Sequence, residues 1–290
     1  MRKLFLTVLV GVCLCFVPGL SFAQGNLGAI TGSVLDPSHA VIPDAAVTIT
    51  ETTTNVTSSV KATSAGYYRV PVPPGTYKVE AKKEGFKVGV AENIRVGVAD
   101  VVTIDITLQV GSTSQSVTVA SEAPLLTTAT AEVGSSVTPT EFATLPIAIN
   151  DGGRQLQTFI FTSLPGTIGD PFAGSINGGQ LFSSEILIDG MSIARFDLNG
   201  GNLTEFSPST DAIGEFKVQQ ANYSAEYGET GGGIANFSMK SGTNAFHGTA
   251  YDYLINDALN AAGFENNALG QSKQTVKDNN FGGTFGGPIR

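Results

Sequence analysis

The chain has 290 residues, of which 35 are glycine, 41% are hydrophobic and only 14% are charged. This composition favours short strands and many turns, and its apolar content excludes a wholly disordered chain. The net charge is −9. An acidic chain without basic clusters repels phosphate backbones, so we expect no nucleic-acid partner.

The first residues predict an export signal. Arg2 and Lys3 precede an apolar run from Leu4 to Val17, and Ser21-Phe22-Ala23 supplies small residues at the positions that a signal peptidase reads. The run is about 14 residues long, short of the roughly 20 that cross a bilayer as a helix. We therefore expect residues 1–23 to be a signal peptide that is cleaved after Ala23.

Residues 27–110 show the pattern of a β-sandwich. Apolar and polar residues alternate with period two, and Gly, Pro and Asp interrupt the alternation at regular spacing. About 80 residues divided in this way predict a seven-stranded antiparallel β-sandwich. The expected strands are 29–36, 45–52, 56–63, 67–70, 76–83, 86–96 and 101–110.

Within this region the sequence resembles the carboxypeptidase regulatory-like domain. The motifs that carry the resemblance are Pro43-Asp44-Ala45, Gly66-Tyr67-Tyr68 and Pro74-Gly75-Thr76-Tyr77. Despite its name, that family is a non-catalytic sandwich fused to many secreted proteins. The resemblance therefore implies an accessory module and no reaction.

Residues 111–138 are rich in Ser, Thr and Ala, which predicts an extended linker. Inside it lies a segment that resembles a TonB box, through which a TonB-type energy-transducing protein engages receptors. An extended β-branched peptide of this kind adds to the sheet edge of a partner through main-chain hydrogen bonds. Two alternatives stay open, the last strand of the sandwich and a solvated linker. The segment consists of Ser116, Val117, Thr118, Val119 and Ala120.

Residues 139–243 change to a mixed α+β pattern. A short amphipathic helix is expected before Pro165, and the stretch 183–193 reads as a strand with a turn at Asp189-Gly190. From Asp211 the sequence predicts a helix start, a strand, a glycine-rich loop and a second strand.

These segments resemble the plug and first barrel strands of Oar-like TonB-dependent receptors. The resemblance rests on "LPIAINDGGRQ", "ILIDGMS", "PSTDAIGEFKVQQANYSAEYGETGGGIANFSMKSGTNAFHGTAYDYLINDALNA" and "FGGTFGGPI", in that order along the chain. It implies a plug domain over 139–243 with Ile188, Asp189 and Gly190 as a plug motif, and the start of an outer-membrane β-barrel over 244–290.

The last segment has the alternation of tilted membrane strands. We expect its bulky residues on the lipid side and its small or polar residues on the lumen side. In the first strand the bulky set is His247, Thr249, Tyr251, Tyr253 and Ile255, opposite Gly248, Ala250 and Asp252; in the second it is Phe281, Phe285 and Ile289, opposite Gly282, Thr284 and Gly286.

No catalytic, cofactor or metal site is expected. Ser58 and Lys61 have the spacing of a serine acyl-transferase motif, but they fall in an alternating run, and a strand places such residues on opposite faces. The two histidines, His39 and His247, are far apart in sequence, and both cysteines lie in the expected signal peptide. We therefore expect a protein that is not an enzyme.

By resemblance, the protein acts in the cell outer membrane in energised uptake. Its expected partners are a TonB-type protein, outer-membrane lipid and an unidentified extracellular ligand. Two barrel strands alone would leave unpaired edges in lipid, so we expect a truncated receptor. The alternative is a secreted or surface carbohydrate-binding or adhesion module built on the sandwich, and the sequence beyond Arg290 would separate the two.

Overall fold

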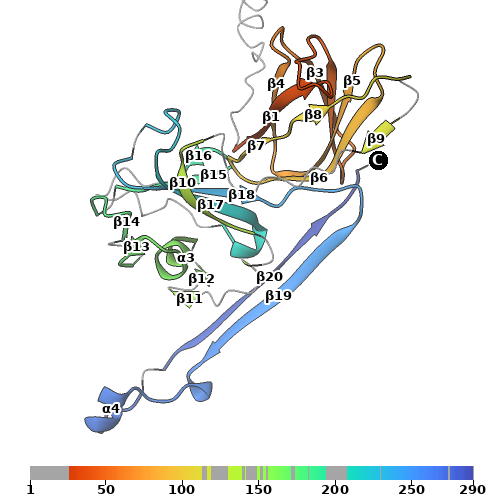
Figure 1. Ribbon diagram of the computed structural model, residues 1–290. Coiled ribbons are helices and arrows are strands. Elements are labelled where there is room, and N and C mark those ends of the chain that lie inside the picture. Colours follow the sequence, from red (N-terminus) through yellow and green to blue (C-terminus); the bar gives the residue numbers. More distant parts are fainter. Residues whose placement is uncertain are drawn as a thin grey trace, which may run out of the picture.

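The computed structural model describes residues 26–112, 116–118, 130–138, 141, 149–150, 153–154, 156–170, 174–181, 183–193, 208–228, 230–273 and 275–289. These residues form a β-sandwich, a second β-sheet body and a long β-hairpin (Figure 1). The expected signal peptide, residues 1–23, lies outside the described residues. Within the described ranges, no helix is long and apolar enough to cross a membrane.

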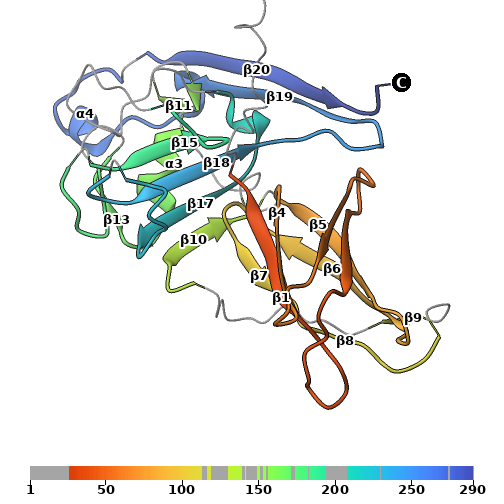
Figure 2. The same ribbon diagram turned by 90° about the horizontal axis from the view of Figure 1, so that it is seen from above.

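The sandwich consists of two facing sheets (Figure 2). One sheet has the order β4-β1-β7, with β8 also paired to β1, and the other has the order β3-β2-β5-β6-β9. Their bounds are β1 Gly28–Leu35, β2 Ala46–Glu51, β3 Thr57–Lys61, β4 Tyr67–Val72, β5 Gly75–Lys82, β6 Val88–Val96, β7 Val101–Thr103, β8 Ile106–Thr107 and β9 Ser116–Thr118.

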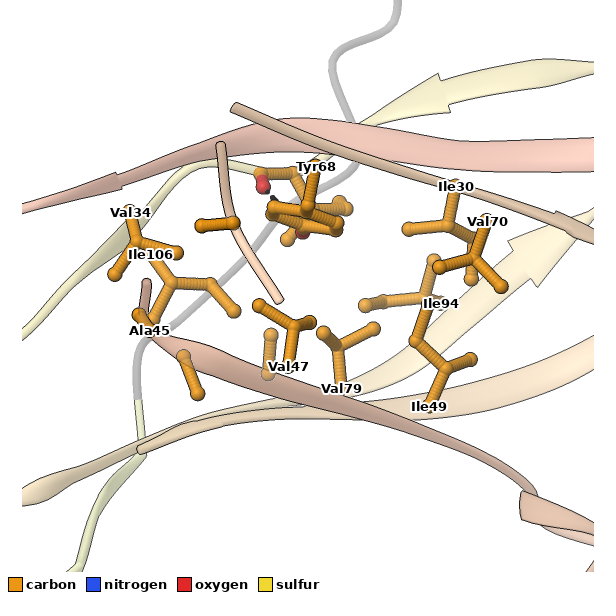
Figure 3. Packing of buried hydrophobic residues seen from close by; sticks show 14 of the residues in the cluster. Ile30, Val34, Ala45, Val47, Ile49, Tyr68, Val70, Val79, Ile94 and Ile106 are labelled. Atoms are coloured by element: carbon orange, nitrogen blue, oxygen red, sulfur yellow. Dashed lines mark hydrogen bonds between the residues drawn. The ribbon is translucent and has the colours of Figure 1, made fainter. Parts of the chain in front are cut away.

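The predicted alternation supplies the sandwich core. In β4, Tyr68, Val70 and Val72 are buried while the residues between them are exposed. Tyr68 and Val70 face Val47 and Ile49 of β2 in the opposite sheet, as Figure 3 shows, and Val72 belongs to the same cluster of buried residues. Burial of each such aliphatic side chain stabilises the fold by about 1.5 to 3 kcal/mol.

The expected last strand, 101–110, is divided in two, and both parts run parallel to β1. The antiparallel description is therefore wrong for this pair. Alternation defines which face a residue occupies, but it does not define the direction of the partner strand. The division lies at Ile104, whose amide donates to the Thr31 carbonyl. The Ile104 carbonyl would clash with a Cβ at position 32, where the chain has glycine.

The second body, which we call the plug body, contains helix α3 and a five-stranded sheet, the plug sheet, in the order β10-β17-β18-β15-β16. Helix α3, Leu156–Ser163, ends before Pro165 as predicted, and its Phe159 ring lies edge-on to Phe216 with centroids 5.0 Å apart. Phe216 in turn stacks on Phe237 at 4.9 Å. The sheet strands are β10 Val133–Val137, β15 Glu185–Ile188, β16 Met191–Ser192, β17 Ile213–Ala221 and β18 Ile234–Met239.

Shorter elements connect these strands. They are β11 Ile149–Asn150, β12 Gly153–Arg154, β13 Thr167–Ile168, β14 Ser175–Ile176 and the 3-10 helix η1 Thr210–Ala212. One difference from the sequence prediction concerns β10, because its residues were assigned to the linker 111–138. They instead pair antiparallel with β17 as an edge strand. The strand begins and ends with a β-branched residue, Val133 and Val137, which favours a strand, but the residues between them show no alternation of apolar and polar side chains.

The hairpin consists of β19, His247–Asn256, and β20, Lys277–Gly286. All ten residues of each strand are paired, from His247 opposite Gly286 to Asn256 opposite Lys277. The connection contains η2, Asp257–Leu259, and α4, Phe264–Ala268. In both views this connection lies at the end of the hairpin far from the sandwich (Figures 1 and 2).

Candidate functional site

The TonB-box-like segment is described in part. Ser116, Val117 and Thr118 form β9, which pairs parallel with β6 and places Val117 opposite Gly89. Val119 and Ala120 lie outside the described residues. For Ser116–Thr118, the structure has the arrangement that the sequence left open as an alternative, a last strand on the sandwich. Any role in binding a partner stays a prediction.

The residues predicted to be a plug motif, Ile188, Asp189 and Gly190, lie at a tight turn between β15 and β16. Ile188 is buried and pairs with Met191, while Asp189 and Gly190 have φ angles of 47° and 81°. Two positive φ angles in a two-residue loop define a type I′ turn, which Asp-Gly favours. Asp189 also accepts a hydrogen bond from the Met239 amide at 3.1 Å, so the motif joins the turn to β18.

The sandwich and the plug sheet meet through charged residues of β17. The Glu215 carboxylate accepts hydrogen bonds from the Arg95 guanidinium and from the Val98 amide, each at 2.7 Å. Burial raises the pKa of Glu215 above its ordinary value, although Arg95 and the Val98 amide favour the charged form. This carboxylate therefore anchors the plug sheet to β6 and to the turn that follows it.

Lys217, two residues further along β17, makes the second charged contact. Its Nζ lies 2.9 Å from Asp100 Oδ1 and 2.7 Å from Glu132 Oε1. Burial works against the ammonium charge, but the two carboxylates outweigh it and raise the pKa of Lys217. Gln219 continues the row and donates to Glu132 at 3.0 Å.

A cavity of about 630 Å³ lies at the same junction. Its lining includes Arg95 and Pro73 from the sandwich, Asp189 and Lys240 from the plug sheet, and His247 at the start of the hairpin. Asn26 also lines it and donates to the Phe237 carbonyl at 3.0 Å. The size is in the range of small-molecule sites, but the Arg95 charge is already paired with Glu215.

The sandwich also contacts the segment that leads into the hairpin. Asn244 donates from its backbone to the Thr53 carbonyl at 3.2 Å and from its side chain to the Thr54 carbonyl at 2.8 Å. The Glu51 carboxylate fixes this loop, because it accepts hydrogen bonds from the amides of Thr53 and Thr54. The β2–β3 loop is thus held in shape where it meets Asn244.

The hairpin has one face toward the plug sheet and one face away from it. Tyr251 hydrogen-bonds to Ser209 at 2.7 Å, and Tyr253 donates to Asp211 at 3.2 Å. In the antiparallel register Phe281 lies opposite Asp252 and Phe285 opposite Gly248, so both phenylalanines project from the other face. They are 77% and 82% exposed.

This arrangement corrects the expected assignment of faces. The sequence placed the tyrosine side of the first strand toward lipid, together with the phenylalanine side of the second. The structure places the two sets on opposite faces, with the tyrosines against the plug body. Alternation alone could not relate the faces of the two strands, because their relation depends on the register of the pair.

The charged residues of β17 were missed as functional candidates. The plug core takes Phe216 and Val218, whereas Glu215, Lys217 and Gln219 alternate with them and project toward the sandwich side. The sequence did contain a signal for this interface: charged and amide residues occupy every second position of the strand, and apolar residues occupy the positions between them. It indicates a strand covered on both faces, one by a core and one by a polar interface.

Catalytic geometry is not found in the candidate acyl-transferase motif. Ser58 and Lys61 both lie on the exposed strand β3. Among the residues that the structure describes, no group of three His, Cys, Asp or Glu residues could hold a metal ion. The histidines His39 and His247 belong to separate parts of the fold, a turn after β1 and the start of β19.

Comparison with known proteins supports the division seen in the structure. Residues 29–109 match the carboxypeptidase regulatory-like domain, and residues 238–290 match an outer membrane beta barrel domain. The TonB-dependent transporter Oar of Myxococcus xanthus is 27% identical over 282 residues, which cover 93% of this chain and 26% of Oar. The chain is therefore similar to Oar over nearly its whole length. It spans about a quarter of the length of that relative.

The two domain matches and the similarity to Oar support a mainly β fold and a location in the outer membrane. Oar itself is named as a transporter and not as an enzyme. Among solved structures, the siderophore receptor PirA of Acinetobacter baumannii matches with a TM-score of 0.34 and 23% identity over 42% of this chain and 19% of PirA. The Bacillus anthracis TIE protein matches with a TM-score of 0.25 and 16% identity over 29% of this chain and 16% of that protein.

Proposed function

We propose that the chain is part of a TonB-dependent outer-membrane receptor that takes up an extracellular ligand with energy supplied by a TonB-type protein. The observation that carries this proposal is the two-sided hairpin. One face is hydrogen-bonded to the plug body through Tyr251 and Tyr253, and the other exposes Phe281 and Phe285.

Strand length supports a membrane role for the hairpin. Each strand has 10 residues, which matches the roughly 9 to 11 needed for a tilted strand to cross a bilayer. Large apolar side chains on the side away from the plug suit contact with lipid, and tyrosine hydroxyls on the plug side suit a polar lumen.

The same proposal assigns roles along the chain. Residues 1–23 are a signal peptide cleaved after Ala23, 27–110 the sandwich, 111–138 a linker that ends in β10, 139–243 the plug and 244–290 the start of the barrel. In the described part of this segment, the parallel pairing of β9 with β6 covers Ser116–Thr118. A TonB-type partner takes residues 116–120 by adding a strand of its own to this segment.

Cysteine labelling tests the membrane arrangement. Glu265→Cys lies in the exposed β19–β20 connection, and Thr57→Cys lies on the exposed edge strand β3 of the sandwich. Because the native cysteines, Cys13 and Cys15, fall in the expected signal peptide, these replacements supply the thiols of the mature protein. We expect a membrane-impermeant maleimide to label position 265 on intact cells and position 57 only after permeabilisation. Equal labelling of both positions would contradict the proposal.

Site-specific cross-linking tests the partner. Val117→Cys is expected to form a disulfide in cells with a cysteine placed in the periplasmic domain of the TonB-type protein, and the adduct is read on a non-reducing gel. A matched Thr57→Cys variant on the sandwich should give no adduct. Replacing Val117 or Val119 with Pro should abolish energised uptake while protein level and ligand binding persist, because proline removes a ladder hydrogen bond. Normal uptake in both proline variants would exclude this segment as the TonB box.

A further inference from the structure

One ammonium group joins two distant segments at the sandwich–plug junction. Lys217 Nζ contacts Asp100, in the turn between β6 and β7, at 2.9 Å, and Glu132, directly before β10, at 2.7 Å. The side chains of Lys217 and Glu132 are each 10% exposed, and that of Asp100 is 34% exposed. A carboxylate of the sandwich and a carboxylate of the segment directly before β10 therefore share one buried cation.

Sharing makes the two contacts interdependent. A buried charge is stable only while its partners offset the loss of hydration, and removing one partner leaves part of that charge uncompensated. Burial of Lys217 opposes its ammonium charge, and it is the two carboxylates, Asp100 and Glu132, that outweigh this effect. When Glu132 is displaced from Lys217, the ammonium is more stable if it turns toward water, and its contact with Asp100 then weakens.

Glu132 also anchors the first residues of β10, next to Ala131, whose carbonyl accepts a hydrogen bond from the Asn222 side chain at 3.1 Å. Among the described residues, this strand is at the edge of the plug sheet and pairs with β17, and its register shifts between Val133 and Gly134. Glu132 accepts from Gln219 at 3.0 Å as well as from Lys217, and Gln219 in turn accepts from Asn236 at 3.3 Å. Side chains of β17 and β18 thus hold the end of β10 where the backbone ladder is irregular.

We propose that Lys217 is a clasp that couples docking of the sandwich on the plug sheet to docking of β10 on β17. Displacing Glu132 loosens the sandwich, and undocking the sandwich at Asp100 loosens β10. Binding linkage requires that such coupling be reciprocal. The inference concerns contacts within this chain and does not depend on the proposed uptake function.

Hydrogen exchange on the whole chain, purified in detergent, tests the clasp in both directions. Asp100→Asn changes the sandwich end and Glu132→Gln changes the β10 end, each with little change of shape. Glu80→Gln is the matched control, because Glu80 forms ion pairs with Lys78 and Lys82 on the sandwich surface, away from Lys217. Exchange in β2 and β5 reports whether the sandwich is folded.

We expect Asp100→Asn to speed exchange of the β10 amides by at least about 5-fold, the lower end of typical coupling between sites. Glu132→Gln should speed exchange in the Val98–Asp100 turn by a similar factor, and Glu80→Gln should change neither. Unchanged β10 exchange in Asp100→Asn, with β2 and β5 still protected, would overturn the proposal. If either variant loses protection in β2 and β5, the exchange rates of the β10 amides are compared between the double variant Asp100→Asn/Glu132→Gln and the two single variants. Strictly additive changes in the free energy of opening at these amides would also overturn the proposal.

Discussion

The Tyr251 hydroxyl lies 2.7 Å from Ser209 Oγ, so the first hairpin strand is joined to the plug body by side chains 42 residues apart in sequence. Tyr253 repeats the contact with Asp211. We expect Tyr251→Phe/Tyr253→Phe to weaken hairpin docking by about 0.5 to 1.5 kcal/mol for each lost hydrogen bond. Faster exchange at the amides of η1 measures the loss.

Tyr67→Phe is the control for this pair. It removes the same hydroxyl group from a tyrosine on the sandwich, where Tyr67 bonds to Thr31. Exchange at η1 should stay at its original rate in this variant. If the double phenylalanine variant also leaves η1 unchanged, the tyrosines do not hold the hairpin to the plug.

A second prediction concerns the pH dependence of sandwich stability. Burial and then the charge of Asp105 raise the pKa of Tyr68, and burial and then the charge of Glu51 raise the pKa of Tyr77 to about 12. Both unfolded tyrosines lose their protons near pH 10, while the folded ones keep them. The free energy of unfolding therefore falls above pH 10, by up to about 1.4 kcal/mol per pH unit for each tyrosine.

Tyr68→Phe separates the two tyrosines. The Tyr68 hydroxyl donates to the Ile104 carbonyl at 2.7 Å, so its removal should lower the free energy of unfolding at pH 7 by about 1 to 3 kcal/mol. It should also make the decline above pH 10 less steep. Urea unfolding from pH 7 to pH 11 measures both effects, and an unchanged decline would show that Tyr68 does not cause it.

A third prediction concerns the turn at Asp189-Gly190. Gly190 has a φ of 81°, which a β-branched residue adopts only with strain. Gly190→Val should destabilise the plug sheet by about 1 to 3 kcal/mol, measured as faster exchange in β15 and β16. Gly242→Ala is the control, because nothing lies within 4 Å of a Cβ built there. Equal protection in both variants would rule out a conformational requirement for glycine in the plug motif.

A fourth prediction compares neighbouring residues on the two faces of β20. Phe281 projects away from the plug and Asn280 toward it, since Asn280 pairs with Tyr253. Arginine near the middle of a lipid-facing strand costs about 2 to 4 kcal/mol, so Phe281→Arg should lower the amount of protein recovered in the outer membrane. Asn280→Arg should lower it less, and the reverse order would mean that the faces are assigned wrongly.

The sequence was sufficient for the sandwich core because each strand shows its buried face by alternation. Tyr68, Val70 and Val72 are buried as the pattern requires. The direction and register of strand pairing could not be predicted from the sequence, because both depend on which strand lies alongside. This is why the parallel pairing of β7 with β1 and the opposed faces of the hairpin differ from expectation.

The junction residues could be predicted even less from sequence. Lys217 and Glu132 are 85 residues apart and Lys217 and Asp100 are 117 apart, so no local pattern relates them. The Asp189-Gly190 turn could be predicted because its conformation depends on these two adjacent residues. The TonB-box-like segment stays a prediction, since strand addition places few demands on sequence and Ser116–Thr118 pair with β6 as an ordinary edge strand would.

The order of the plug sheet has a consequence for folding during export. Its first strand along the chain, β10, is at the edge, while its last, β18, lies between β17 and β15. A chain that crosses the inner membrane from its N-terminus completes the sandwich strands β1–β8 early, but β15 has no parallel neighbour until residues 234–239 emerge. Non-local pairing of this kind is slow and leaves apolar strands exposed. We therefore expect the plug sheet to form later than the sandwich, and export faster than chaperone capture should cause aggregation of its strands before it affects the sandwich.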